Sequence, residues 1–397
     1  MRGPKTCLEP SSGAWPPEGL RGTPEGPRMI TATTHPRHPG PASWQTELAA
    51  AYTSPAALAE ALDLDPTTLG LQALPAKAPA AAHASPVAAH SDGTGSASPS
   101  AFRMLVPASY VRRMRRGDPR DPLLLQVLPS ERENEDFAGF TADPVGERAA
   151  MRAPGLLKKY EGRALLITTS ACAVHCRYCF RREFPYTEHL DDVRRWRGAL
   201  EEIARDASIE EVILSGGDPL SLSDSRLTTL TDALAKVPHL RRLRVHTRQP
   251  IVLPSRVDAG LVAWLKGLRL PTVVVLHSNH PNEINDEVRE ACAALRSSGV
   301  TLLNQSVLLR DINDRPDVLV QLSHRLFDAG VLPYYLHVLD PVRGAAHFDV
   351  PDEVARRIVG EVSAQLPGYL VPRLVREVHG APAKVSLAPR FSNGGGC

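Results

Sequence analysis

The sequence of 397 residues lacks an uninterrupted apolar run of about 18 residues, the least that a membrane-spanning helix needs. It also lacks, near its start, the continuous apolar stretch of a secretory signal. Neither sign of charge dominates, because 46 Lys and Arg balance 44 Asp and Glu to a net charge of +2. This balance gives no reason to expect nucleic acid or a membrane surface as a partner. We therefore expect a cytoplasmic protein, with 43% hydrophobic residues available for a sizeable core.

Cysteine is scarce, since six cysteines in 397 residues are too few for a disulfide scaffold. Three of them, Cys172, Cys176 and Cys179, follow the spacing C-x3-C-x2-C. Three thiolates on one loop can hold three corners of a [4Fe–4S] cluster, which normally takes four cysteines. The other cysteines are distant in the sequence: Cys7, Cys292 and Cys397. One iron would then stay open for a substrate or cofactor, whereas the alternatives are structural thiols or a zinc site with His175 as fourth ligand.

Composition separates the N-terminal part of the chain into segments. Residues 1–40 are rich in Pro and Gly without periodicity and are predicted to be a disordered tail, within which Met29 is a candidate start. Residues 41–73 are expected to form a short helical N-terminal extension. Residues 74–100 contain Ala, Pro and Ser but no core-forming residues, which predicts a linker.

Residues 101–162 are expected to be a helical lead-in, with a basic helix from Ser109 to Arg116 that ends at Gly117 and exposes its arginines to solvent. From residue 163, apolar β-rich runs alternate with gaps that can each hold an amphipathic helix. The runs start near Ala164, Val212, Leu243, Thr272, Thr301 and Leu332. Between the fourth and fifth runs, one helical face collects Ile284, Val288, Cys292 and Leu295. Six such units predict an α/β fold, a parallel sheet curled into a partial (β/α)6 barrel over residues 163–340.

Polar residues follow these apolar runs. The cysteines come after the first run, and the later runs are followed by Gly216-Gly217-Asp218, Thr247-Arg248, His277-Ser278-Asn279, Asn304-Gln305 and Asp340. Ligands of α/β barrels and sheets bind at the carboxyl ends of the strands. We therefore expect these residues to converge at one mouth and to form an active site there.

The aromatic residue Tyr178 before Cys179 completes C-x3-C-x-aromatic-C, which resembles the radical S-adenosylmethionine (SAM) signature. Within that superfamily the chain resembles the lysine 2,3-aminomutases, and most of all the branch that makes β-lysine for modification of translation elongation factor P. The resemblance spans roughly residues 103–385 and is carried by LKKYEGRALLITTSACAVHCRYCFRREFPY, VILSGGDPLSL, LRVHTRQPIVLPSRV, TLLNQSVLLRDIND, LPYYLHVLDPVRGAAHF and GYLVPRLVREVHGAPAK.

The resemblance implies a cluster held by the three neighbouring cysteines, whose open iron binds SAM. One-electron reduction by an external donor then cleaves SAM to a 5′-deoxyadenosyl radical. It also implies pyridoxal 5′-phosphate (PLP), held as a Schiff base on Lys384, which follows a Gly/Pro turn in an otherwise apolar stretch. Residues 341–390 would be the C-terminal segment that carries this lysine, and residues 391–397 a flexible tail.

Further family positions carry over one residue at a time. Arg181 matches the arginine that holds the substrate carboxylate, for which a planar guanidinium is suited. Arg163 matches a basic residue near the PLP phosphate, with Tyr160 beside it. Lys159 stands where the family often has a second arginine, which replaces a planar fork by a point charge.

The SAM side of the implied site involves glycine backbone and two polar side chains. Gly216, Gly217 and Asp218 resemble the motif that lets backbone approach the methionyl group of SAM, although a simple turn explains a lone Gly-Gly-Asp equally well. Gln305 and Arg248 are expected to line the SAM or PLP side of the pocket.

Two acidic positions bear on the substrate. Asp340 matches a carboxylate that binds the distal ammonium of lysine, with a turn cap before Pro341 as the alternative. Glu377, seven residues before Lys384, stands where clostridial-type enzymes have aspartate. Because a buried ammonium needs compensating charge, the acidic pair favours lysine over glutamate.

The resemblance thus implies an isomerase that converts L-lysine to β-lysine, with the (R) enantiomer favoured, in functional connection with elongation factor P and its lysyl ligase. The alternatives are a glutamate or arginine 2,3-aminomutase, a radical SAM enzyme without PLP, and a non-enzymatic iron–sulfur protein. The oligomeric state, a homo-oligomer included, stays open.

Overall fold

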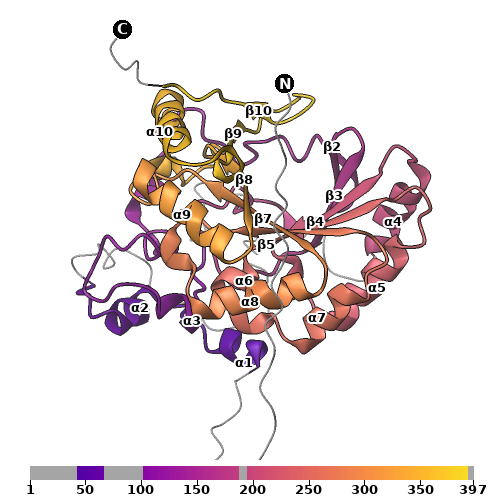
Figure 1. The fold of residues 1–397 in the computed structure, drawn as a ribbon, viewed down its shortest axis with the longest axis horizontal. Helices are drawn as coiled ribbons and strands as arrows, with labels where there is room; N and C mark the ends of the chain where they lie inside the picture. The colour runs from indigo at the N-terminus through magenta and orange to yellow at the C-terminus, as the bar shows by residue number, and fades with distance from the viewer. Residues whose placement is uncertain (1–42, 67–101, 187–194, 392–397) are drawn as a thin grey trace, which may run out of the picture. The chain divides into compact units, whose positions relative to one another are not determined.

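The structure is a computed structural model that describes residues 43–66, 102–186 and 195–391 (Figure 1). The predicted tail 1–40, the linker 74–100 and residues 392–397 of the predicted C-terminal tail lie outside these residues. So do Met29, Cys7 and Cys397.

The described residues contain one sheet whose ten strands follow one another in chain order. Its parallel strands are β3 (Arg163–Thr169), β4 (Glu211–Gly216), β5 (Arg242–Thr247), β6 (Thr272–His277), β7 (Thr301–Val307), β8 (Leu332–His337) and β9 (Arg373–Arg376). Antiparallel strands flank them at both ends: β1 (Met151–Ala153), β2 (Leu156–Tyr160) and β10 (Val385–Ser386). The six predicted strands and the partial barrel are therefore confirmed, and the three outer antiparallel strands and β9 are additions.

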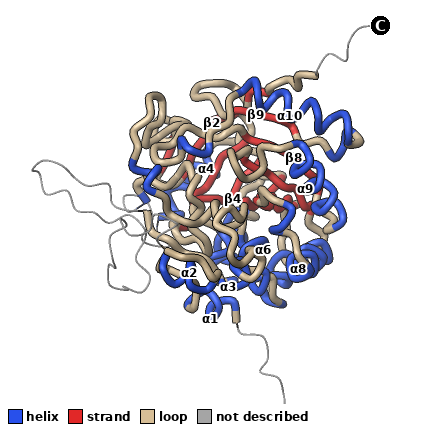
Figure 2. The backbone as a smooth tube through the Cα atoms, turned by 90° about the vertical axis from the view of Figure 1, so that its left-hand side faces the viewer, coloured by secondary structure: helices blue, strands red, loops and turns tan. Residues whose placement is uncertain are grey.

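Helices fill the gaps between the parallel strands and surround the sheet (Figure 2). They are α4 (Arg195–Arg205), α5 (Asp224–Leu234), α6 (Gln249–Val252), α7 (Ala259–Lys266), α8 (Asp286–Ser297), α9 (Pro316–Asp328) and α10 (Asp352–Gln365). Three of them begin where a polar side chain accepts a backbone N–H of the first turn: Ser223, Asp258 and Asn285. On α8, the predicted face of Val288, Cys292 and Leu295 is buried.

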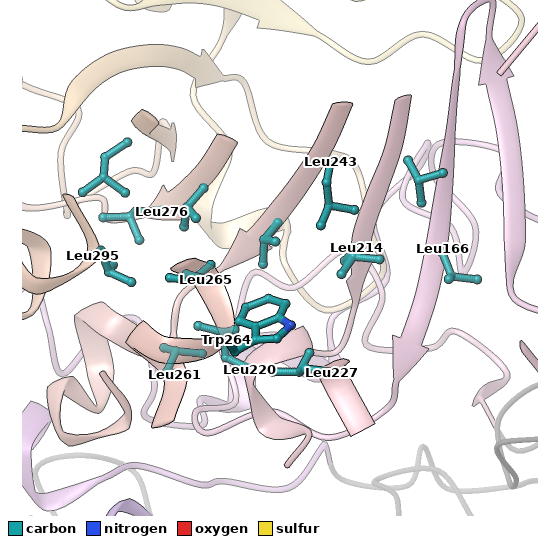
Figure 3. Close-up of a cluster of buried hydrophobic side chains, with 14 of the residues drawn as sticks. Leu166, Leu214, Leu220, Leu227, Leu243, Leu261, Trp264, Leu265, Leu276 and Leu295 are labelled. Carbon is teal, nitrogen blue, oxygen red and sulfur yellow. The ribbon is translucent and has the colours of Figure 1, made fainter. Parts of the chain in front are cut away.

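The main core lies between the sheet and these helices. Leu214, Leu243 and Leu276 from three neighbouring strands pack toward helix residues that include Leu227 and Trp264 (Figure 3). Side chains alternate along a strand, so the residues directly before and after each of these leucines face the inside of the curled sheet. The inner face is where the polar residues of the site are found.

The prediction of a helical lead-in over residues 101–162 is wrong. Residues 102–162 hold only α3 (Ala108–Val111), the 3-10 turn η2 (Glu131–Asn134), β1 and β2, rather than a helical lead-in. Prolines, which end helices, interrupt the segment at six positions: 107, 119, 122, 129, 144 and 154. The predicted basic helix stops at Val111, and Arg113 is half-buried and donates to the carbonyls of Ile251 and Glu283.

The N-terminal extension does contain two short helices, α1 (Trp44–Ala49) and α2 (Pro55–Ala61), which share a second hydrophobic cluster with residues 104–128. None of the helices within the described ranges has the length and apolar character to cross a membrane.

Candidate active site

The three neighbouring cysteines lie in the loop that follows β3. Cys172, Cys176 and Cys179 are unpaired thiols. Burial, with the charge of Asp218 and the other two thiols adding to it, raises the pKa of Cys172 well above its usual value. Burial and neighbouring Cys176 raise the pKa of Cys179 to about 11. The thiols are thus close enough to act on one another, and a bound cation would reverse these shifts by favouring the thiolates.

The zinc alternative gains no support from the geometry. His175, its candidate fourth ligand, has Nδ1 3.0 Å from the carbonyl oxygen of Arg103, and its ring lies against Phe102. Among the described residues, no three His, Cys, Asp or Glu side chains meet the geometry for one metal ion.

Two glycines let the end of β4 lie directly against the cysteine loop. The N–H of Gly217 donates to the carbonyl of Thr169 at 2.7 Å, and a Cβ on Gly217 would lie 2.3 Å from the carbonyl oxygen of Ala171. Gly216 has a φ of +121°, and its Cβ would lie 2.6 Å from the oxygen of Thr169. Glycine is therefore required here to seat the loop, whatever backbone contact these residues also make with a cofactor.

Asp218 is buried, and its carboxylate accepts hydrogen bonds from other groups of the protein. It accepts from the hydroxyl of Thr247 at 2.8 Å and from the backbone N–H groups of Leu220, Arg248 and Gln249. These bonds fix the connection from β5 to α6. Both carboxylate oxygens are occupied by these bonds. The backbone approach to SAM expected of Gly216, Gly217 and Asp218 does not involve this carboxylate and stays a prediction.

Arg248 lies against the cysteine loop. Its Nη1 is 2.7 Å from Sγ of Cys176 and 2.5 Å from the hydroxyl of Tyr178, and its Nη2 donates to Oε1 of Gln126 at 2.7 Å. Glu283, which is fully buried, lies 3.5 Å from the same nitrogen. Arg248 thus belongs to the cysteine side of the site, whereas Gln305 lies on β7 between His277 and Tyr335 of the neighbouring strands.

Lys384 forms the centre of a second group of residues. Its Nζ is 2.5 Å from Oε2 of Glu377, while Oε1 of Glu377 accepts from the hydroxyl of Tyr160 at 2.7 Å and lies 3.3 Å from Nζ of Lys159. Glu377 and Lys384 are seven residues apart in the sequence but lie opposite each other, because Val385 pairs with Arg376 in the β9–β10 hairpin. Since β2 contributes Lys159 and Tyr160, the contacts bring opposite ends of the sheet together.

The two acidic residues of this group differ in charge state. Burial raises the pKa of Asp340 to about 7, with Lys384 opposing and Glu377 adding to the shift. At Glu377 burial is outweighed by Lys384, Lys159 and Tyr160, and the pKa falls to about 2. Glu377 is therefore ionised and paired at neutral pH, while Asp340 titrates and is stabilised as an anion by an arriving cation.

Arg181 connects the two sides of the site. It donates through Nε and Nη2 to the carboxylate of Glu147 at 2.8 and 2.6 Å, and through Nη1 to the hydroxyl of Ser215 at 3.1 Å. Glu147 is also among the charges that act on Asp340, so Arg181 and the Lys384 group are neighbours. Arg163 stacks its guanidinium 4.5 Å above the ring of Tyr160.

The structure therefore brings together Lys384, Glu377, Asp340, Lys159 and Tyr160, with Arg181 beside them and the cysteine loop next to Arg181. Sequence reasoning missed several polar residues that carry no local pattern, of which the first three are buried and the two histidines half-buried: Gln126, Glu147, Glu283, His246 and His337. Chemically, three thiols on one glycine-backed loop suit an iron–sulfur cluster. A lysine amine between carboxylates and basic groups suits a carbonyl cofactor that carries a phosphate.

Comparison with known proteins identifies related enzymes. Residues 166–322 match the family model of the Radical SAM superfamily. The chain is 51% identical over 286 residues to the L-lysine 2,3-aminomutase of Escherichia coli (strain K12), a match that covers 72% of this chain and 83% of that protein. It is 46% identical to the enzyme of the same name from Haemophilus influenzae, over 72% and 85% of the two chains. With the Clostridium subterminale enzyme it shares 35% identity over 73% and 70%.

Proposed function

Because the chain belongs to the lysine 2,3-aminomutase family of radical SAM enzymes, we propose that it converts L-lysine to β-lysine, the (R) enantiomer, by moving the amino group from C2 to C3. The observation that carries the choice of substrate is the pair of carboxylates at Lys384. Asp340 and Glu377 lie at the lysine that would hold PLP, where they match a cationic side chain and oppose an anionic one.

The residues present fit the implied cofactors. Cys172, Cys176 and Cys179 would hold a [4Fe–4S] cluster on the glycine-backed loop. Lys384 would hold PLP, with Lys159 and Arg163 as basic partners for its phosphate. When bound, the cluster and SAM supply hydrogen-atom abstraction, and PLP supplies the carbonyl group that carries the migrating nitrogen.

The protein's own part is to bind and orient the substrate. Arg181 would donate a charged hydrogen bond to the substrate carboxylate through the second N–H of Nη2, because Nη1 already donates to Ser215 and to the carbonyl of Gly216. Asp340, and Glu377 once Lys384 has left it, would hold the distal ammonium. The curled sheet excludes water from the bound groups, which strengthens each of these interactions.

We further propose a cytoplasmic enzyme that takes electrons from an external donor and passes β-lysine to the lysyl ligase that modifies elongation factor P. This placement rests on the family branch that the sequence resembles.

One anaerobic assay tests the reaction. Reconstituted protein receives dithionite, SAM, PLP and an equimolar mixture of lysine, glutamate and arginine, and derivatised products are identified by mass spectrometry. We expect β-lysine alone, with none from a Cys172→Ala variant. SAM cleavage without any β-amino acid would overturn the aminomutase proposal, and β-glutamate or β-arginine would overturn the substrate.

A further inference from the structure

A histidine nitrogen on the inner face of the sheet is among the buried polar atoms that lack a partner. Nε2 of His246 is inaccessible to solvent and makes no hydrogen bond to any described residue. His246 lies on β5, where Leu243 and Val245 pack outward against the helices. Since side chains alternate along a strand, His246 points to the inner face of the sheet, toward the site. A polar atom that is buried without a partner is costly, and a ligand would satisfy it.

The strand register places His246 beside the residue that supports Arg181. Leu214 of β4 pairs with Val245 of β5, so the next residues, Ser215 and His246, are neighbours on the inner face. Ser215 in turn accepts a hydrogen bond from Nη1 of Arg181 at 3.1 Å.

Lys384 lies close to β8 of the same sheet. Its Nζ lies 6.0 Å from the ring centre of Tyr335 on β8. Burial, with the positive charges of Arg244, Lys384 and Arg181 adding to it, holds the pKa of His246 well below its usual value. The imidazole is therefore neutral at physiological pH and lies within the electrostatic reach of both Arg181 and Lys384.

We propose that His246 is a ligand-contacting residue of this site, whose Nε2–H donates a hydrogen bond to an anionic oxygen of the molecule bound between Arg181 and Lys384. The inference rests on the proposed function and adds a residue to it. A neutral imidazole has one N–H to donate, and an anionic oxygen is the acceptor that also suits the N–H groups of Arg181 and Lys384. Two oxygens have this chemistry: the substrate carboxylate and the phenolic oxygen of PLP.

Substitutions at His246 distinguish a contact with the substrate carboxylate from a contact with PLP. His246→Leu fills a similar volume without a donor, and His246→Gln keeps an amide N–H near the position of Nε2. His324→Leu, at an exposed position of α9, is the matched control. For each variant we would measure iron content, thermal unfolding, the dissociation constant of PLP from its absorbance without substrate, and KM and kcat for lysine.

A contact with PLP predicts that His246→Leu weakens PLP binding about tenfold before any lysine is added. A contact with the substrate predicts unchanged PLP binding and a KM for lysine raised by about the same factor. In both cases His246→Gln recovers most of the loss, and the control matches the wild type.

Wild-type values of PLP affinity, KM and kcat in His246→Leu would overturn the contact while leaving the proposed function intact. If that variant does not fold, His246→Asn decides, because its amide reaches the position of Nδ1 but not that of Nε2. Wild-type behaviour of the Asn variant would likewise overturn the contact. A wild-type protein that binds neither PLP nor lysine would overturn the proposed function, and this inference with it.

Discussion

Arg181 and Glu147 form a buried two-pronged ion pair, with Nε 2.8 Å from Oε2 and Nη2 2.6 Å from Oε1. The pair fixes the plane of the guanidinium and occupies one of its edges. If Arg181 binds the substrate carboxylate as proposed, the carboxylate would approach along the opposite edge, where Nη1 already donates to Ser215 at 3.1 Å and to the carbonyl of Gly216 at 3.4 Å. Glu147 thus acts as a positioning residue for Arg181 from a position 34 residues earlier in the chain.

Glu147→Gln should lower the stability of the protein and weaken lysine binding. Removal of one partner of a buried ion pair leaves the other charge uncompensated, which costs roughly 3–5 kcal/mol in the free energy of unfolding. Because Arg181 loses its fixed orientation, we also expect a KM for lysine raised about tenfold, with PLP binding unchanged. Denaturant unfolding and steady-state kinetics measure the two effects.

Glu183→Gln is the control for that substitution, because Glu183 pairs with the exposed Arg343 and surface pairs contribute about 0–1 kcal/mol. Equal stabilities for the two variants would contradict the role given to Glu147.

Lys384→Ala should separate the two halves of the site. The variant loses the amine that would hold PLP, so the absorbance of protein-bound PLP should disappear. The cysteine loop makes none of the hydrogen bonds described for Lys384, and SAM should still be bound and reductively cleaved. Absorbance spectra and 5′-deoxyadenosine release measure the outcome, with Lys266→Ala on the surface of α7 as control. An unchanged PLP spectrum would remove Lys384 from this role.

If Asp340 binds the lysine ammonium as proposed, its pKa should make lysine binding depend on pH. The pKa is raised from its ordinary value to about 7 by burial, so the carboxyl is protonated below neutral pH. Because the folded state holds this proton more tightly, the protonated carboxyl adds to the free energy of unfolding at low pH, and that contribution is lost as the pH rises through 7. Binding of the lysine ammonium has the opposite sign, since it requires the carboxylate.

We therefore expect the KM for lysine to rise about tenfold per pH unit below pH 7. Asp340→Asn should abolish this slope, raise KM at pH 8 and stabilise the substrate-free protein at that pH. Glu377→Gln is the matched comparison, because the pKa of Glu377 lies at about 2 and its removal leaves the slope in place. A slope that survives in Asp340→Asn would assign the titration to another group.

Arg248 should set the reduction potential of a cluster bound at the cysteines. Its guanidinium lies 2.7 Å from Sγ of Cys176, and a positive donor at a ligating sulfur stabilises the reduced, more negative state. Arg248→Met should lower the midpoint potential by on the order of 50 mV. A redox titration followed by electron paramagnetic resonance measures the shift, with exposed Arg242→Met as control. Identical potentials would show that Arg248 has only a structural role.

Patterns along the chain were sufficient for the strands but not for the contacts between distant loops. The apolar runs and the polar residues after them identify β3 to β8 and the mouth of the barrel, because both follow from the period of a strand. Glu147 and Gln126 lie in irregular segments where no period exists, and their partners Arg181 and Arg248 are 34 and 122 residues away. The Gly-Gly-Asp motif likewise gives no sign that the carboxylate of Asp218 binds Thr247 and the backbone of the connection from β5 to α6, because these partners lie about 30 residues away.

The close approach of β4 to the cysteine loop yields a final prediction, for Gly217→Ala. The added Cβ would lie 2.3 Å from the carbonyl oxygen of Ala171 and 2.7 Å from that of Ser170, which are backbone atoms that cannot rotate away. The loop must therefore move, and with it Cys172, which is next in the chain. We expect reconstituted Gly217→Ala to hold much less iron than the wild type and to retain its circular dichroism spectrum.

Gly198→Ala supplies the contrast, because a Cβ on that α4 residue meets no atom within 4 Å. Alanine at a helical glycine should stabilise the protein by roughly 0.5–1 kcal/mol and leave its iron content unchanged. Full iron loading of Gly217→Ala would mean that the cysteine loop tolerates displacement. The close packing of β4 against this loop would then not determine cluster binding.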